Sequence, residues 1–395
     1  MDKQSVNTAI AANAALAARS PKDGSYTARL DKIYDWMANE GIALLMLEDT
    51  ETRRDLNIRW FTGHPGDALL FLSVDRKAIL AAWDINLAKV YAALSPVLIA
   101  SYTDFDRKPS KAIAAVVQKM GIPSGSKIEI PCVTPYPVFL EFVSDLMNYD
   151  ILCREKGAAS QINKLRAVKD EKEISVLRKA ANITNEIIDS LEKSVRSGKI
   201  KTEADAAFFI ETEARKKGCE GTSFATLAAG PDRSFSIHSF PSSTNAPFGG
   251  KGLSILDFGV KMGGYCTDVT LTFANDIDPK QEKLVSLIDK ASKTALAMAS
   301  NGTNTRDIAA AVDTLFSKSK KKMPHSLGHG IGLQEHEYPA LRNSVENEWV
   351  LESGMVFTIE PALYDPLLGG CRLENDILMT NTGHEVLTTA RIIKL

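Results

Sequence analysis

Residues 254–273 have the sequence SILDFGVKMGGYCTDVTLTF. Two apolar runs separated by a short glycine-containing turn are typical of a β-hairpin. A turn centred on Met262 and Gly263 predicts that Asp257 lies directly opposite Asp268, with Cβ atoms about 5 Å apart. Like charges there destabilise a hairpin unless a proton or cation lies between them, and two divalent ions about 3.5 to 4 Å apart fit the gap. From this stretch alone, a metal site and an exposed hairpin with two solvated Asp residues both stay open.

Histidines gather in a second segment, residues 324–339, with the sequence PHSLGHGIGLQEHEYP. Three of the six histidines in the chain, His325, His329 and His336, fall within twelve positions. A lone histidine is more often a core or surface residue than a ligand, but three so close together, among flexible glycines, favour a site.

Carboxylates mark two further segments. The run MVFTIE at 355–360 is followed by Pro361, so Glu360 lies at a strand end, where it can point into a cleft. In GCRLENDIL at 370–378, a period of two places Arg372, Glu374 and Asp376 on one face of a strand. Taken alone, that face is typical of an ordinary surface ladder.

Together the four segments offer four carboxylates and one or more imidazoles. Oxygen-rich ligation suits Mn²⁺ or a similar divalent ion better than a thiolate zinc site. A water bridging two such ions is acidified and becomes a hydroxide nucleophile near neutral pH. The predicted reaction class is therefore hydrolysis.

The composition excludes several other classes of protein. The 395 residues carry 47 Lys and Arg against 49 Asp and Glu, which argues against a groove for nucleic acid. No apolar run approaches the roughly 20 residues that span a bilayer. The five cysteines form no CxxC pair, so we expect a reduced, cytoplasmic protein. The Ala-rich residues 8–18 are interpreted as a helix rather than a signal peptide.

Apolar periodicity divides the chain into two predicted domains. Residues 1–160 alternate between helix and strand, as in an α/β domain. The polar stretch 154–163, REKGAASQIN, is interpreted as the boundary. Residues 161–395 group helices and strands without regular alternation, which indicates an α+β domain. Asp55, His64 and Asp84 in the first domain form no constellation, and we expect surface or capping roles for them.

These residues resemble those of the pita-bread dinuclear metallopeptidases, the superfamily of prolidase (Xaa-Pro dipeptidase), aminopeptidase P, methionine aminopeptidase and creatinase. The Asp…Asp spacing of 11 (268 − 257) and the His…His spacing of 7 (336 − 329) carry the resemblance. It implies a creatinase-like N-terminal domain at 1–160 and a pita-bread catalytic domain at 161–395. His336-Glu337 followed by Pro339 is most similar to the short prokaryotic prolidases.

The resemblance also implies roles for single residues. The implied ligands of two divalent ions, Mn²⁺ first, with Co²⁺, Zn²⁺ or Fe²⁺ as alternatives, are Asp257, Asp268, His329, Glu360 and Glu374. Asp268 and Glu374 would bridge the ions, and Glu360 would also act as general base. The implied substrate-side residues are His238, His325, His336 and Arg372, with His238 and His336 also taking part in catalysis. Arg372 would orient Glu374 or pair with a substrate carboxylate.

The implied activity is hydrolysis of the bond preceding proline in Xaa-Pro dipeptides by a metal-bridging hydroxide. Aminopeptidase P activity on longer Xaa-Pro-Yaa peptides, a metal-free creatinase-like amidinohydrolase and a non-enzymatic binding protein are the alternatives. The implied partners are a small peptide with proline in second position and a second copy of the chain in a homodimer, with no nucleic acid or membrane. Leu271 replaces the usual arginine of the family and Ala362 the usual glycine, which puts fine specificity in doubt.

Overall fold

The computed structural model describes residues 24–395, and the predicted helix at 8–18 lies outside this range. Contacts divide the chain into unit 1, which ends at Leu165, and unit 2, which spans Arg166–Leu395. No helix within residues 24–395 is both long enough and apolar enough to cross a bilayer.

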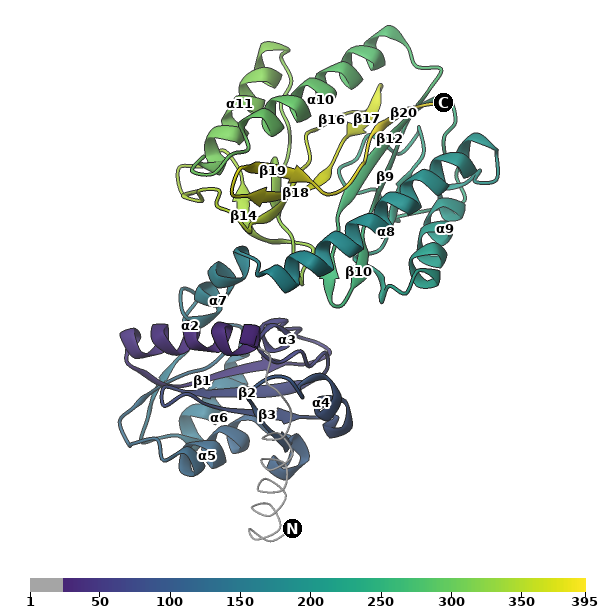
Figure 1. Ribbon diagram of the computed structural model, residues 1–395. Helices are drawn as coiled ribbons and strands as arrows, with labels where there is room; N and C mark the ends of the chain where they lie inside the picture. The colour runs from purple at the N-terminus through teal and green to yellow at the C-terminus, as the bar shows by residue number, and fades with distance from the viewer. Residues whose placement is uncertain (1–23) are drawn as a thin grey trace. The chain divides into compact units, whose positions relative to one another are not determined.

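Unit 1 is a six-stranded mixed sheet with helices packed on it (Figure 1). Its strand order is β4-β3-β2-β1-β5-β6, with β2 antiparallel to both neighbours and the other pairs parallel. Leu30, Ile33, Tyr34 and Met37 lie on the buried face of α2, at the spacing of three and four residues that one face of a helix requires. The elements are α2 (Gly24–Glu40), β1 (Ile42–Asp49), α3 (Asn57–Thr62), β2 (Ala68–Ser73), β3 (Lys77–Ala82), α4 (Ile85–Tyr91), β4 (Leu98–Ser101), the 3-10 helix η1 (Tyr102–Phe105), α5 (Pro109–Met120), β5 (Lys127–Glu129), α6 (Tyr136–Asp145) and β6 (Asp150–Leu152).

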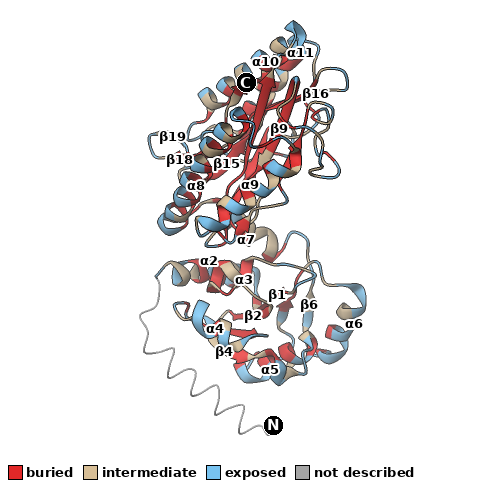
Figure 2. Ribbon diagram, turned by 90° about the vertical axis from the view of Figure 1, so that its right-hand side faces the viewer, coloured by how far each residue is buried: buried red, intermediate tan, exposed pale blue. Residues whose placement is uncertain are grey.

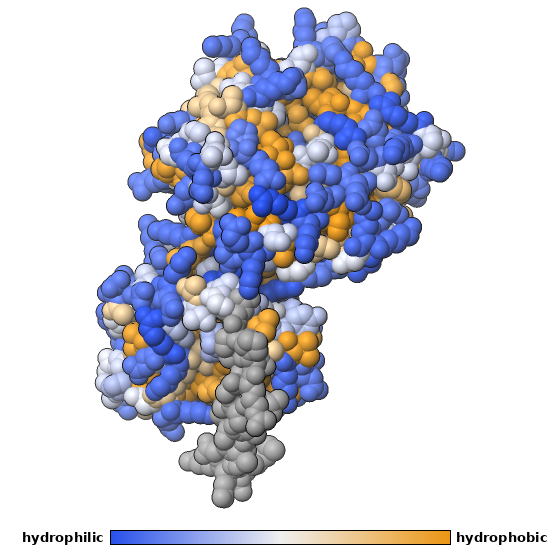
Figure 3. Space-filling model, viewed as in Figure 1, coloured by the Kyte–Doolittle hydropathy of each residue, from blue (hydrophilic) through white to orange (hydrophobic). Residues whose placement is uncertain are grey.

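Four helices surround the strands of unit 2, and Figure 2 shows those strands as its buried interior. Helices α8 (Glu171–Arg196) and α10 (Pro279–Met298) begin at capping boxes, Asp170 with Glu173 and Asp278 with Gln281. The other helices are α9 (Glu203–Lys216) and α11 (Thr305–Lys318). In Figure 3, hydrophobic residues on the visible face of this unit gather toward its middle, between hydrophilic rims.

The strands of unit 2 form several small sheets, with orders β11-β10-β7, β20-β12-β9-β8, β14-β13-β15-β18-β19 and β16-β17. Their bounds are β7 (Gly221–Thr222), β8 (Leu227–Ala229), β9 (Gly252–Phe258), β10 (Val260–Met262), β11 (Tyr265–Cys266), β12 (Val269–Asn275), β13 (Gly328–Gly330), β14 (Glu337–Leu341), β15 (Val356–Ile359), β16 (Ala362–Asp365), β17 (Gly369–Arg372), β18 (Asn375–Thr380), β19 (Gly383–Val386) and β20 (Ile392–Lys394). Strands and helices are grouped, as predicted for an α+β unit.

The polar stretch at 154–163 is partly helical rather than a simple linker. Helix α7 (Ala158–Ala167) begins within it. The buried carboxylate of Glu129 accepts a hydrogen bond from the Ala158 N–H at 2.5 Å and so satisfies one donor of the first helical turn. Only Ala158, Ile162 and Ala167 are buried apolar residues of α7, so its apolar stripe is too sparse to show a period in the sequence.

The predicted hairpin forms, but its turn lies one residue later than predicted, which shifts each cross-strand partner by two residues. Met262 pairs with Tyr265, so Gly263 and Gly264 make the turn, and their φ values are +56° and +86°. A tight turn with two positive φ values favours glycine at both positions, which excludes Met262 from the turn. Asp257 therefore lies opposite Thr270 rather than Asp268, and the direct Asp257–Asp268 pairing was wrong. Both carboxylates nonetheless line one pocket, because Asp268 precedes Thr270 by two residues and strand faces repeat every two.

Gly259 allows the two halves of this hairpin to approach each other. A Cβ atom at this position would lie 1.6 Å from the backbone oxygen of Thr267. We therefore expect Gly259→Ala to lower the free energy of unfolding by at least about 2 kcal/mol, because the backbone cannot yield as a side chain would. Urea unfolding measures this loss. The matched control is Gly24→Ala, where a Cβ meets nothing within 4 Å, and equal unfolding midpoints for the two variants would contradict the expectation.

Candidate metal centre

One pocket of about 390 Å³ in unit 2 brings together all nine residues to which the family resemblance gives a role. They come from segments far apart in the chain. Asp257 lies in β9, Asp268 immediately before β12, and His329 in β13. Glu360 follows β15, and Glu374 lies between β17 and β18. Arg372, His238, His325 and His336 complete the set.

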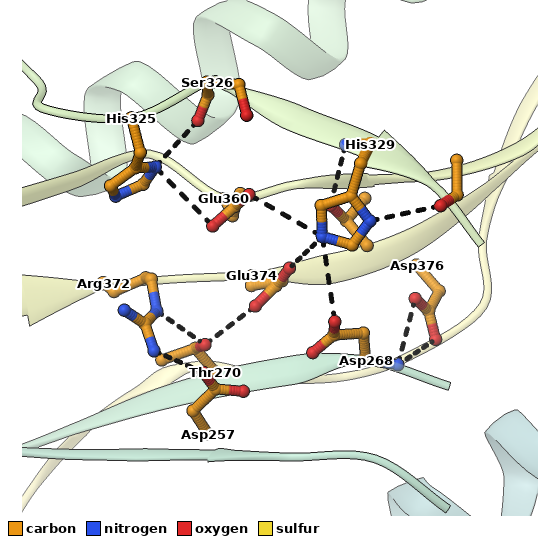
Figure 4. Close-up of polar contacts among 12 residues, drawn as sticks. Asp257, Asp268, Thr270, His325, Ser326, His329, Glu360, Arg372, Glu374 and Asp376 are labelled. Carbon is orange, nitrogen blue, oxygen red and sulfur yellow. Dashed lines mark hydrogen bonds and ion pairs between the residues drawn. The ribbon is translucent and has the colours of Figure 1, made fainter. Parts of the chain in front are cut away.

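Three carboxylates surround the imidazole of His329 (Figure 4). Its Nε2 atom lies 3.8 Å from an oxygen of Asp268, 3.8 Å from Glu360 and 3.9 Å from Glu374. These distances are too long for hydrogen bonds. They fit ligands that share an ion, because two atoms that each lie about 2.1 Å from one ion are at most about 4.2 Å apart. One donor atom from each of Asp268, His329 and Glu374 lies within 4.8 Å of the others.

The ring of His329 is held in the orientation that a metal ligand needs. Its Nδ1 lies 3.1 Å from the carbonyl oxygen of Gly330, so an N–H there leaves the Nε2 lone pair facing the carboxylates. Burial, with a further contribution from His336, lowers the pKa of His329 to about 3 and keeps its imidazole neutral. The His336 ring packs against it, with centroids 4.0 Å apart.

The carboxylates destabilise one another in the absence of a cation. Burial is the largest cause that raises the pKa of Asp268 and of Glu360, followed for both by the charge of Glu374. Burial also raises the pKa of Glu374 to about 7, with Asp257 as the next cause. Among residues 24–395, the buried oxygens without a hydrogen-bond partner include Oδ1 of Asp257 and Oδ1 of Asp268. Buried carboxylate oxygens that face a shared space fit divalent cations.

Arg372 is the single Lys or Arg among the pocket-lining residues in the described part of the chain. Its side chain is 2% exposed and donates to Asp257, to Thr270 Oγ1 at 2.9 Å, to the Ile237 carbonyl at 3.0 Å and to Tyr364 Oη at 2.7 Å. In this structure it therefore contacts Asp257 rather than Glu374.

The strand predicted at 370–378 is interrupted. Arg372 ends β17, and Asp376 belongs to β18 in another sheet, so the continuous strand face was wrong. All three side chains still turn toward the segment that starts at Asp268. Arg372 and Glu374 both bond to Thr270 Oγ1, and Asp376 accepts from the Asp268 backbone N–H at 3.2 Å. At the break, Glu374 forms a single isolated β-bridge with Thr270.

Thr270 and Tyr364 are site residues that the sequence reasoning missed. Thr270 donates to Glu374 at 2.8 Å. The alternation of Asp268, Thr270 and Thr272, three buried polar residues on one face, is a signal that could have identified it. Tyr364 Oη lies 3.2 Å from Nε2 of His325, and no local pattern in the sequence marks it.

Two other histidines lie outside the pocket. His384 Nδ1 lies 2.8 Å from the Ala299 carbonyl, a structural contact. His64, expected at the surface or in a cap, is 0% exposed in unit 1, so that expectation was wrong. Asp84 does cap a helix, because its side chain accepts from Asn86 and Leu87 at the start of α4.

The amino-acid sequence matches one protein family and several relatives. The model of metallopeptidase family M24 matches residues 175–381. The chain is 35% identical over 235 residues to YkvY of Bacillus subtilis, a protein named as a candidate dipeptidase, with 59% of this chain and 63% of the relative aligned. A Staphylococcus aureus protein named as an uncharacterized peptidase is 34% identical over 230 residues, which are 58% and 64% of the two chains. The chain thus matches less than two thirds of these relatives' length.

Solved structures match most of the chain. An Xaa-Pro dipeptidase from Bacillus anthracis has a TM-score of 0.80 at 24% identity, covering 94% of this chain and 100% of that one. A prolidase from Thermococcus sibiricus gives 0.79 at 25% identity, with 95% and 100% covered. An X-Pro aminopeptidase from Thermotoga maritima gives 0.76 at 23% identity, with 90% and 98% covered. These likenesses confirm the predicted pita-bread fold.

Proposed function

Because the chain belongs to metallopeptidase family M24, we propose that it hydrolyses the peptide bond preceding proline in Xaa-Pro dipeptides. The observation that carries the proposal is the pocket in which four carboxylates and His329 converge, with unpartnered buried oxygens on Asp257 and Asp268. The structures with a similar fold named as Xaa-Pro dipeptidase and prolidase support the choice of bond.

The family implies divalent metal ions, and the donor set of this pocket fits them. We assign Asp257, Asp268, His329, Glu360 and Glu374 as ligands, and Mn²⁺ as the preferred metal because four of the five are carboxylates. When bound, the ions supply an acidified water as nucleophile and polarise the scissile carbonyl.

Side chains of the pocket perform the remaining steps of the proposed reaction. Glu360 takes the proton of the attacking water, because its carboxylate lines the pocket and burial raises the pKa of that carboxyl well above its ordinary value. His336, packed on His329, stabilises the charge that develops on the carbonyl oxygen. Arg372 positions Asp257 through their hydrogen bond.

The proline residue of the substrate determines how the leaving nitrogen must be protonated. The nitrogen of an Xaa-Pro bond has no N–H, so the site must deliver a proton to it without relying on a contact to such a hydrogen. His238 is exposed and lines the pocket, where its imidazole can carry that proton. His325 lies beside it on the substrate side, and burial lowers the pKa of His325 to about 4.

Aminopeptidase P activity is the second candidate, because the X-Pro aminopeptidase from Thermotoga maritima has a similarly close fold. An assay with Mn²⁺ that offers an Xaa-Pro dipeptide and an Xaa-Pro-Yaa tripeptide separates the two. We expect turnover of the dipeptide. Turnover of the tripeptide alone would replace the dipeptidase proposal by the aminopeptidase.

Metal removal is expected to abolish hydrolysis and to lower the melting temperature, because the buried carboxylates then lose their counter-charge. Dialysis against a chelator, followed by addition of Mn²⁺, Co²⁺, Zn²⁺ or Fe²⁺, tests both effects. We expect two ions per chain by elemental analysis and the highest activity with Mn²⁺. Full activity of the metal-free protein would contradict the proposal.

The setting of the enzyme belongs to the same proposal. The five cysteines form no disulfide in the described residues, which supports a reduced, cytoplasmic location. We also propose a homodimer, which sedimentation of the purified protein tests, a monomer being the contrary result.

A further inference from the structure

A loop formed by residues 231–243, here called the His238 loop, forms one wall of the pocket. It follows β8 and supplies Ile237, His238, Ser239 and Ser242 to the lining. His238 itself is exposed, so packing around its own ring does not hold it. Its position over the pocket depends on what holds the loop.

The carboxylate of Glu203 holds both ends of this loop. Glu203 is the first residue of α9 and is 0% exposed. Its Oε1 accepts from the Gly230 N–H at 2.7 Å, immediately before the loop. Its Oε2 accepts from the N–H of Thr244 at 2.8 Å and from the Thr244 hydroxyl at 2.6 Å, immediately after the loop. One side chain thus closes the loop at its base.

Further contacts extend from Glu203 into the loop. Arg233 forms an ion pair with Glu203 at 3.4 Å and donates to the carbonyl of Pro241 across the loop. The Ser239 hydroxyl donates to the Arg233 carbonyl at 2.9 Å. On the pocket side, Arg372 donates to the carbonyl of Ile237, the residue before His238. The residues on both sides of His238, Ile237 and Ser239, are therefore held by hydrogen bonds.

Only a carboxylate satisfies this environment. Every group that faces Glu203 in these contacts is a donor, and an ionised carboxylate accepts through both oxygens, whereas an amide would point an N–H₂ group at one of the donors. The first turn of a helix also favours a negative charge. Burying a charge is nonetheless costly, and Glu203 is absent from the pocket lining, so it touches neither substrate nor metal ligands.

The geometry points to Glu203 as a positioning residue that sets His238 over the pocket by closing the His238 loop. The inference rests on the proposed function, in which His238 serves the leaving nitrogen. Glu203 acts through the loop, and His238 is the loop residue with a role in the proposed reaction, so we expect the effect of Glu203 on turnover to pass mainly through His238.

A double-mutant cycle tests this coupling. We expect Glu203→Gln to lower kcat/KM for an Xaa-Pro dipeptide by about 10- to 100-fold, mainly through kcat, because a displacement near 1 Å can cost that much. In the His238→Ala background the same substitution is expected to cost less than about twofold. The matched control is Glu211→Gln, a partly exposed position on the same helix whose side chain pairs with Arg215, and it should leave kcat/KM unchanged. Equal losses in both backgrounds would overturn the inference.

Hydrogen exchange supplies a measurement that does not need activity. Amides of residues 231–243 should exchange at least about tenfold faster in Glu203→Gln than in wild type or Glu211→Gln, while Mn²⁺ binding by calorimetry stays within about twofold. Unchanged loop exchange would contradict the inference. If Glu203→Gln fails to fold, Thr244→Val replaces it in the test, because it removes only the hydroxyl donor. We then expect a smaller loss of kcat/KM and a smaller increase in the exchange of the loop amides. If wild type cleaves no Xaa-Pro peptide, the proposed function fails, while exchange still decides whether Glu203 holds the loop.

Discussion

The Glu374→Gln variant is expected to fold, to bind Mn²⁺ weakly and to lose more than about 100-fold in kcat, because the change removes the charge of a central ligand and almost no volume. The amide oxygen can still accept from Thr270, whose hydroxyl lies 2.8 Å from Glu374. Burial raises the pKa of Glu374 to about 7, so its charged form at pH 8 destabilises the metal-free fold relative to a neutral side chain. The metal-free variant should therefore be at least as stable as metal-free wild type at that pH.

Two measurements check this expectation. Calorimetry with Mn²⁺ gives the loss of affinity, and thermal melts at pH 8, with and without Mn²⁺, give the stability of each form. Glu385→Gln, a surface glutamate paired with Arg178, is the control and should keep wild-type metal binding. A Glu374→Gln enzyme with full activity would remove Glu374 from the proposed ligands.

Arg372→Met is expected to lower the free energy of unfolding of the metal-free protein by about 3 to 5 kcal/mol, because it leaves the Asp257 carboxylate buried beside other acids without its cation. Four hydrogen bonds disappear with the guanidinium, including that to the Ile237 carbonyl. Divalent ions should restore part of the loss, since they replace the missing positive charge next to Asp257.

Urea unfolding with and without Mn²⁺ measures both effects. Arg391→Met is the matched control, because Arg391 pairs with Asp189 and Glu192 at the surface, where its side chain is 38% exposed. That substitution should cost less than about 1 kcal/mol. A loss of similar size in the two variants would show that the buried Asp257–Arg372 pair contributes no more than a surface ion pair.

Elements with strong local signals were predictable from the sequence. Helices α8 and α10 combine a capping residue, Asp170 or Asp278, with a regular apolar stripe, and both signals can be recognised in the sequence alone. The hairpin was located too, but its register depended on which two residues make the turn, and the positive φ of Gly264 settles that only in the structure. Helix α7 was missed because Glu129, distant in sequence, caps it.

The candidate site shows the same division. Four segments rich in Asp, His and Glu indicated a metal site, the resemblance to the metallopeptidases implied the individual roles and added His238, and the nine residues so named line one pocket. The contacts between them were not predictable. Arg372 bonds to Asp257, 115 positions earlier, and to Ile237, 135 positions earlier, and no local period encodes such pairs. For the same reason Tyr364 and Glu203 escaped the sequence reasoning.

The bridge between Thr270 and Glu374 also bears on how the chain folds. Its two residues are 104 positions apart. Closing so long a loop costs conformational entropy, and this cost is offset only when the surrounding residues pack cooperatively, late in folding. The metal centre should therefore be among the last parts of the chain to form, and a nascent or partly folded molecule would hold no ions. Adding Mn²⁺ at increasing delays during refolding tests this: uptake should follow the slowest folding phase, and uptake in an early phase would contradict it.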